Sequence, residues 1–250
     1  MTFDDPSVVV DELRSAPRPL LVVTDVDGTL SPIAPRPDQA RLAPGALDAL
    51  RAVAALDGVM LAVVSGRSLR ELREQFGLLD AWNLVGSHGA ESAVAGSLTA
   101  AETALRDELA SVLGEIAAAV PGAMVEAKPV AMALHVRGAS PEGAQQAMAA
   151  ARAAYGDDAR VAVHEGRAVY EIAVRPVTKA IALAELRRRL GPASVAFFGD
   201  DRSDETAFAV DGLVDIGVKV GTAPTLAQWR VADPTDVVEV LRRLASPQTK

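Results

Sequence analysis

The chain has 250 residues, half of them hydrophobic, and a formal net charge of −8. It contains no cysteine, which excludes disulfides, zinc–thiolate sites and thiol chemistry. No apolar run approaches the roughly 20 residues of a membrane span, and no basic run indicates nucleic-acid binding. The first residues lack the basic and apolar segments of a secretory signal, so we expect a cytoplasmic protein without nucleic-acid or membrane partners.

Apolar strands and amphipathic helices alternate in both terminal parts of the chain. In the first part we predict a strand at 20–24, a helix at 44–56, a strand at 59–64, a helix at 68–76, and short apolar segments at 82–85 and 92–94. In the last part we predict a helix at 178–190, a strand at 194–198, a helix at 204–211, a strand at 213–218 and a helix at 235–244. This order is typical of an α/β protein with a parallel sheet.

The middle of the chain breaks this alternation. It predicts a helix at 101–120, strands at 123–126 and 132–137, a helix at 141–155, and strands at 159–164 and 168–174. An αββαββ unit of this kind pairs its strands antiparallel and covers one sheet face with its helices. We therefore expect a core from residues 1–100 and 177–250, and an inserted cap, or lid, from 101–176 with hinges near 96–100 and 175–177.

Carboxylates follow two of the predicted strands at the point where each strand ends. Asp25 and Asp27 come after the first strand, and Asp200, Asp201 and Asp204 come after the strand at 194–198. Ligands bind at the carboxyl ends of parallel strands, and crowded negative charges need a compensating cation. Oxygen ligands favour Mg²⁺ over zinc. The alternative, helix caps or solvated loops, suits Asp204 at a helix start but does not explain two carboxylates at one strand exit.

The order of four motifs resembles the haloacid dehalogenase superfamily of phosphatases. The motifs are D-V-D-G-T-L at 25–30, S-G-R at 65–67, Lys179, and G-D-D-R-S-D-E at 199–205, and together they span most of the chain. The resemblance implies a Rossmannoid parallel-sheet core with an inserted α/β cap of the C2B type.

The same resemblance implies a role for each catalytic group. Asp25 would be the nucleophile that forms an aspartyl-phosphate, and Asp27 the general acid and base. Mg²⁺ would neutralise charge between the substrate and the nucleophile. The residues implied at the metal are Asp25, Asp27 through its main-chain carbonyl, and Asp200, with Asp201 and Asp204 completing or supporting the shell.

The S-G-R motif and Lys179 are weak signals on their own, and they indicate a function only because they occur in the order of the four motifs. Ser65, Gly66 and Arg67 would bind phosphate oxygens where a strand meets a helix N-terminus. Taken alone, they also fit an ordinary helix entry capped by Ser68. Lys179 lies in the first turn of a predicted helix, where the helix dipole disfavours a cation, so we expect a stronger partner there: Asp25 and the phosphate.

A closer resemblance is to the trehalose-6-phosphate phosphatases. It rests on G-S-H-G-A-E at 86–91, V-E-A-K at 125–128, G-R followed by Glu171, and the segment from 219 to 234. The family implies that Glu126, Lys128 and Glu171 contact the glucose that carries no phosphate. Without this resemblance, the same side chains are interpreted as an exposed sheet face with salt bridges. His88 has two open interpretations, a substrate contact or a residue that shapes its loop.

The sequence departs from the family pattern at Ala180, Val136 and Ser203, where glycine, tyrosine and threonine are common. None of these positions carries a catalytic group, so they bear on substrate preference. We expect a monomeric, Mg²⁺-dependent phosphatase of trehalose 6-phosphate, acting in trehalose biosynthesis alongside a trehalose-phosphate synthase. The alternatives are a phosphatase of sucrose 6-phosphate or mannosyl-3-phosphoglycerate, and a non-catalytic sugar-phosphate-binding partner of such a synthase.

Overall fold

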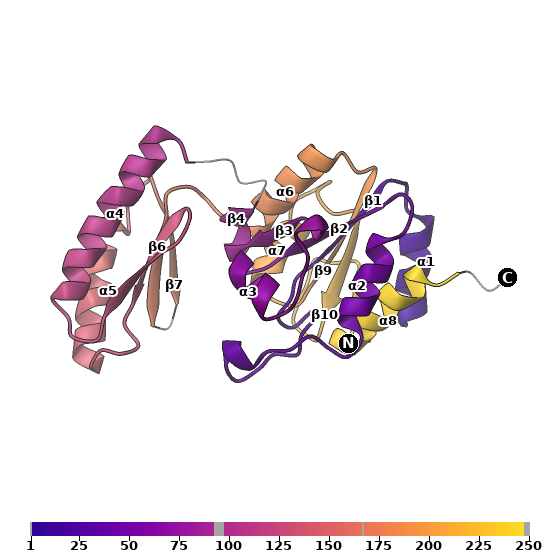
Figure 1. Ribbon diagram of the computed structural model, residues 1–250, viewed down its shortest axis with the longest axis horizontal. Coiled ribbons are helices and arrows are strands. Elements are labelled where there is room, and N and C mark those ends of the chain that lie inside the picture. Colours follow the sequence, from indigo (N-terminus) through magenta and orange to yellow (C-terminus); the bar gives the residue numbers. More distant parts are fainter. Residues whose placement is uncertain (1, 93–97, 167, 248–250) are drawn as a thin grey trace. The chain divides into compact units, whose positions relative to one another are not determined.

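A computed structural model describes residues 2–92, 98–166 and 168–247 (Figure 1). These residues divide into two compact units, one within residues 1–95 and 178–250 and the other within 96–177. Each unit is described by itself. In the described ranges, none of the helices has the length and apolar composition of a membrane span.

The larger unit is built on a seven-stranded sheet with the order β11-β10-β9-β1-β2-β3-β4. Its strands are β1 (Leu20–Thr24), β2 (Val59–Val64), β3 (Leu84–Gly86), β4 (Glu91–Ser92), β9 (Ser194–Gly199), β10 (Ile216–Val220) and β11 (Trp229–Val231). All neighbouring pairs of this described sheet are parallel except β3 and β4. The predicted parallel core is therefore confirmed, with β1 at its centre between β9 and β2.

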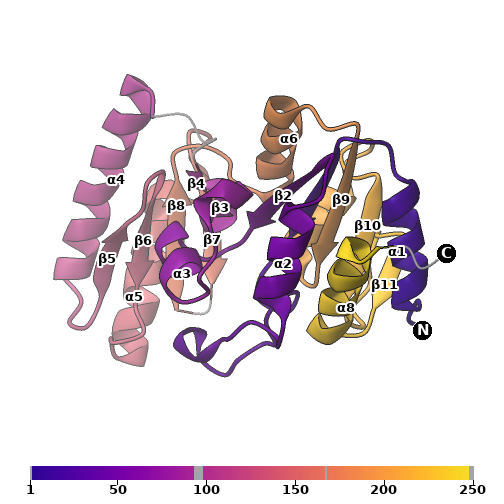
Figure 2. The ribbon, with the colours of Figure 1, turned by 45° about the vertical axis from the view of Figure 1, so that its right-hand side comes forward.

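Helices cover both faces of this sheet. They are α1 (Pro6–Ser15), α2 (Ala46–Ala54), α3 (Leu69–Glu74), α6 (Lys179–Leu190), α7 (Arg202–Phe208) and α8 (Pro234–Ala245). Successive strand side chains point to opposite faces, so Leu20 and Val22 pack into one apolar cluster with α1, α2 and α8. Leu21 and Val23 pack into another with α6 and α7. Figure 2 shows α1, α2 and α8 together on one side of the sheet.

The smaller unit has the predicted αββαββ order. It comprises α4 (Ala100–Ala118), β5 (Met124–Ala127), β6 (Ala131–His135), α5 (Pro141–Tyr155), β7 (Ala162–Gly166) and β8 (Val169–Ala173). The strands form an antiparallel sheet in the order β5-β6-β8-β7, and both helices lie on one face of it (Figure 1). Leu105, Leu109 and Leu113 are buried at four-residue spacing, which places them on one stripe of α4.

Several predicted elements differ from the structure. Trp82 belongs to a single 3₁₀ turn (Asp80–Trp82), and Asn83 then adopts a left-handed conformation with φ 51°, so β3 starts only at Leu84. β10 starts later than predicted because the chain turns at Gly212, whose φ is +69°. Helix α1 and strand β11 were not predicted. Of the predicted segment 92–94 and the hinge 96–100, residues 93–94 and 96–97 lie outside the described residues.

Candidate active site

Neighbouring strand ends bring the first, second and fourth motifs to one edge of the core sheet. Thr24, the last residue of β1, pairs with Phe198 of β9 and with Val63 of β2. The main-chain N–H of Asp25 continues this pairing with a 3.0 Å hydrogen bond to the carbonyl of Phe198. The residues that follow these three strands, including Asp25 and Ser65, therefore leave the sheet side by side.

Three carboxylates converge at this edge. Asp25, Asp200 and Asp204 each offer one oxygen, and these oxygens lie within 4.8 Å of one another. Glycines make the approach possible. A Cβ at Gly28, whose φ is +81°, would lie 1.9 Å from the Asp200 carboxylate, and a Cβ at Gly199 would lie 2.3 Å from the Asp204 carboxyl carbon. Any larger residue at either position would displace a carboxylate.

Lys179 is the cation of this cluster, and its side chain is only 2% exposed. It is the first residue of α6, and its Nζ lies 3.0 Å from Asp25 Oδ2 and 2.7 Å from Asp204 Oδ1. Burial favours the neutral amine, but the charges of Asp25, Asp204 and Asp201 outweigh it and raise the pKa of Lys179. The unfavourable position at a helix N-terminus is thus offset by two close carboxylates.

One ammonium does not neutralise three carboxylates, and the pKa values of the three carboxyl groups are all raised. Burial raises the pKa of Asp25 to about 6 despite the charge of Lys179. Burial, together with the charges of Asp204 and Asp201, raises the pKa of Asp200 to about 6. Burial and the charge of Asp25 raise the pKa of Asp204 to about 7. The cluster carries more negative charge than its surroundings stabilise, which is the electrostatic setting that a bound cation relieves.

The oxygens in this cluster differ in their availability to a metal. Asp200 Oδ1 is buried and has no hydrogen-bond partner among the described residues. Asp204 is fully engaged, since its Oδ1 accepts from Lys179 and its Oδ2 from the main-chain N–H groups of Asp200 and Asp201. The cluster therefore fits a hard divalent cation, with Asp25 and Asp200 as the available oxygens and Asp204 as the group that orients its neighbours.

Asp201 has a different task in the structure. Its Oδ1 accepts hydrogen bonds from Ser203 N, Ser203 Oγ and Asp204 N, which makes it the N-cap of α7. Burial opposes its charge, but Lys179 and these hydrogen bonds lower the pKa of Asp201 to about 2. The helix-cap interpretation of this acidic cluster therefore applies to both residues: Asp201 is the N-cap, and Asp204 completes a capping box by accepting from the Asp201 N–H.

Arg67 contacts Asp27, a pairing that sequence reasoning missed. The two side chains form a bidentate ion pair, with Nε 2.6 Å from Asp27 Oδ2 and Nη2 2.8 Å from Asp27 Oδ1. Arg67 also donates to the carbonyl of Pro37 and stacks over the ring of Phe76. Its side chain is 8% exposed, so the structure commits this guanidinium to Asp27, and its predicted contact with phosphate stays a prediction.

Ser65 and His88 meet around Gly66. Ser65 is buried and its Oγ accepts from the main-chain N–H of Arg67, while its carbonyl accepts from the N–H of His88. A Cβ at Gly66 would lie 2.6 Å from the His88 imidazole, so the ring rests directly against this glycine. His88 itself has φ 56°. The structure thus places the histidine beside the second motif, in the same unit as Asp25.

The predicted sugar-binding residues lie in the smaller unit and pair with one another or with a neighbour. Lys128 Nζ is 2.5 Å from Glu171 Oε2, and Glu126 Oε2 is 2.9 Å from His135 Nε2. Glu126 and Glu171 are both paired in register with Ala133 of β6, so they lie on one face of the sheet. This face carries charged donors and acceptors around a small central alanine.

Comparison with known proteins agrees with these motifs. The trehalose-phosphatase family model matches residues 23–242. The trehalose-6-phosphate phosphatase of Escherichia coli is 36% identical over 220 residues, covering 85% of this chain and 82% of that protein. An uncharacterized glycosyl hydrolase of Mycobacterium tuberculosis is 38% identical over 245 residues, which cover 90% of this chain but only 18% of that protein.

A solved structure extends the likeness to the fold. The trehalose-6-phosphate phosphatase of Aspergillus fumigatus superimposes with a TM-score of 0.68 at 26% identity, covering 98% of both chains. The family model spans all four motifs, and the Escherichia coli relative covers most of the chain. The chain therefore belongs to the trehalose-phosphatase family.

Proposed function

We propose that this protein is a Mg²⁺-dependent phosphatase that hydrolyses trehalose 6-phosphate to trehalose and inorganic phosphate through an aspartyl-phosphate on Asp25. The observation that carries the proposal is the buried Asp25 carboxylate, which lies beside Lys179 and is grouped with Asp200, whose Oδ1 has no hydrogen-bond partner among the described residues. Family membership and the names of the relatives support the substrate.

In the proposed reaction, Asp25 attacks phosphorus with the oxygen that Lys179 does not hold, and the bond to the sugar oxygen breaks. Asp27 gives its proton to that oxygen and then takes one from the water that attacks the aspartyl-phosphate. Phosphate leaves, and both carboxyl groups return to their starting states. General acid–base assistance of this kind contributes a factor of about 10² to 10⁴.

The remaining groups orient the reacting residues or neutralise the charge of the substrate. Lys179 stabilises the charge that moves between Asp25 and the phosphoryl oxygens, and a Mg²⁺ held by Asp25 and Asp200 would supply further neutralisation of the dianion. Arg67 fixes Asp27 through the observed ion pair. To act as the acid, Asp27 takes up a proton on one oxygen and keeps its contact with Arg67 through the other, so that its O–H can donate to the leaving oxygen. The hydroxyl of Ser65 and nearby main-chain N–H groups would bind phosphate oxygens.

We further propose that Glu126, Lys128 and Glu171 bind the glucose that does not react. Sugar hydroxyls both donate and accept hydrogen bonds, so alternating carboxylates and an ammonium on one sheet face suit them. Lys128 pairs with Glu171 and Glu126 pairs with His135 on that face, and sugar hydroxyls can join or replace these pairs. For His88, we propose a contact with substrate from its position against Gly66.

Phosphate release across a substrate panel tests the proposal. The protein is incubated with Mg²⁺ and trehalose 6-phosphate, sucrose 6-phosphate, mannosyl-3-phosphoglycerate or glucose 6-phosphate, with EDTA as the metal control. We expect the highest kcat/KM on trehalose 6-phosphate and loss of activity in EDTA. A higher kcat/KM on another sugar phosphate would reassign the substrate. Binding of trehalose 6-phosphate without phosphate release would support the non-catalytic alternative.

A further inference from the structure

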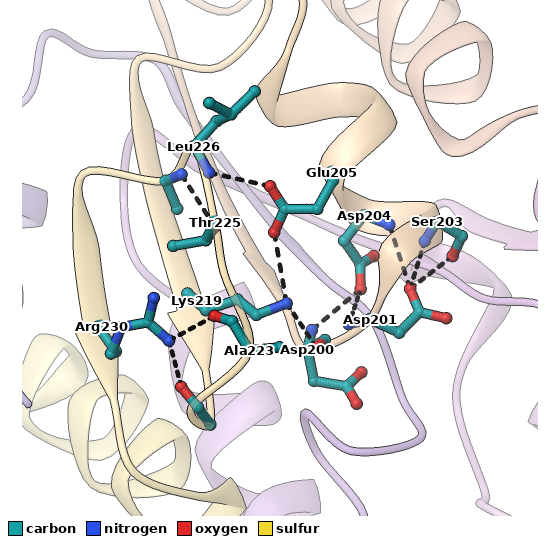
Figure 3. Close-up of polar contacts among 12 residues, drawn as sticks. Asp200, Asp201, Ser203, Asp204, Glu205, Lys219, Ala223, Thr225, Leu226 and Arg230 are labelled. Atoms are coloured by element: carbon teal, nitrogen blue, oxygen red, sulfur yellow. Dashed lines mark hydrogen bonds and ion pairs between the residues drawn. The ribbon is translucent and has the colours of Figure 1, made fainter. Parts of the chain in front are cut away.

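The structure contains a second buried lysine that the proposed reaction does not use. Lys219 lies on β10, and its side chain is 1% exposed, in a strand that is otherwise apolar or glycine. Burying an ammonium is unfavourable unless acceptors surround it. Here its Nζ donates to the main-chain carbonyl of Asp200 at 2.5 Å and lies 3.3 Å from Glu205 Oε1 (Figure 3).

This lysine contacts the main chain of a proposed metal ligand. The side chain of Asp200 has a buried oxygen without a hydrogen-bond partner among the described residues, so its direction depends on how the main chain is held. The N–H of Asp200 donates to Asp204 Oδ2 at 2.9 Å, and its carbonyl accepts from Lys219. The polar groups on both sides of the Asp200 Cα are therefore fixed, one by Asp204 and the other by Lys219.

Glu205 extends this contact to the segment that follows β10. One of its oxygens faces Lys219, and the other accepts from the main-chain N–H of Leu226 at 2.9 Å (Figure 3). The near end of the same segment, residues 221–228, is held by Arg230, which donates to the carbonyls of Gly221 and Ala223. A continuous series of polar contacts thus runs from the Leu226 N–H through Glu205 and Lys219 to the Asp200 carbonyl.

We propose that Lys219 is a positioning residue of the metal site: it fixes the main chain of Asp200, and with it the direction of the Asp200 carboxylate, and links this residue to segment 221–228. The inference rests on the metal site of the proposed function. A methionine at 219 would fill a similar volume but leave the Asp200 carbonyl without its donor and Glu205 without its cation. The carboxylate would then spend less time in the direction that a metal needs.

The test is Mg²⁺ binding, measured by the Mg²⁺-dependent shift in melting temperature. We expect Lys219→Met to raise the apparent Mg²⁺ dissociation constant about 10- to 100-fold, the usual effect of removing a partner that orients a metal ligand. Excess Mg²⁺ should restore kcat, with the KM for trehalose 6-phosphate unchanged, whereas a merely structural defect would not respond to metal. Amide exchange in segment 221–228 should become faster.

Arg230→Met is the matched control, because it removes a buried cation that holds the same segment but does not touch Asp200. It should accelerate exchange near Gly221 and leave the Mg²⁺ constant unchanged. Glu205→Gln keeps Lys219 and removes only its counter-charge, so it should weaken Mg²⁺ binding less than Lys219→Met. If Lys219→Met does not fold, Glu205→Gln becomes the deciding variant. Unchanged Mg²⁺ binding in Glu205→Gln would then overturn the inference.

Two results separate this inference from the proposed function. Wild-type Mg²⁺ affinity in Lys219→Met, or equal weakening in Arg230→Met, would overturn the role of Lys219 and leave the metal site standing. Absence of any Mg²⁺-dependent shift in the wild-type protein would overturn the metal site and this inference with it.

Discussion

Asp200 should destabilise the metal-free protein, and Asp200→Asn should reveal by how much. The pKa of Asp200 is about 6 in the folded protein against an ordinary 3.8, because burial and two neighbouring carboxylates disfavour its charge. The folded state thus binds this proton more tightly than the unfolded state does. Stability is highest below pH 4 as far as this group is concerned, and falls as the pH rises through 6.

The size of the effect follows from the shift. About two pKa units correspond to roughly 3 kcal/mol, and partial exposure of the group reduces this to about 1–3 kcal/mol. In EDTA at pH 8, Asp200→Asn should therefore raise the free energy of unfolding by that amount, and the gain should shrink toward pH 4. With Mg²⁺ at 100 times its dissociation constant, the wild-type protein gains about 2.7 kcal/mol that the variant lacks, which offsets most or all of the variant's advantage and reverses the order where that advantage is about 1–2 kcal/mol.

Urea denaturation at pH 5 and pH 8, with EDTA or Mg²⁺, measures these differences, and the fluorescence of the buried Trp82 reports unfolding. Asp201→Ala is the control. Its carboxylate caps α7 and has a lowered pKa, so its contribution is present above pH 4 and is lost toward pH 2. Removing this cap should cost about 1 kcal/mol with or without metal. A metal-free Asp200→Asn protein less stable than wild type at pH 8 would refute the electrostatic reasoning.

Three further variants test the catalytic and sugar-binding assignments. Asp25→Asn should release no phosphate beyond background while its circular dichroism stays that of the wild type; full turnover would exclude a covalent intermediate on this residue. Arg67→Ala should lower kcat about 10²-fold or more with little change in KM, because Asp27 loses the partner that fixes its position; an effect on KM alone would instead assign Arg67 to phosphate binding. Lys128→Ala should raise KM for trehalose 6-phosphate but leave hydrolysis of p-nitrophenyl phosphate unchanged, and equal losses on both substrates would argue against sugar recognition by the Lys128–Glu171 pair.

Much of the fold follows from short-range patterns. β1 and β2 were predicted with their observed bounds because a buried strand of a parallel sheet is a continuous apolar run between breaks. The helix α5 (Pro141–Tyr155) was likewise predicted with its observed bounds, which a serine N-cap and a proline in the first turn mark. Strand β11 has three residues and no clear periodicity, so nothing local distinguishes it from a loop.

The order and periodicity of the residues indicate which of them stand at strand ends, and therefore which can share an edge of the sheet. They do not indicate which side chains are in contact, because those contacts join residues that are far apart in the chain. Arg67 holds Asp27 across 40 residues, Lys128 holds Glu171 across 43, and Lys219 reaches the Asp200 carbonyl from the neighbouring strand. Periodicity tells which face a side chain takes, but a long, flexible cation can reach several acceptors from that face. The packing around it selects one of them.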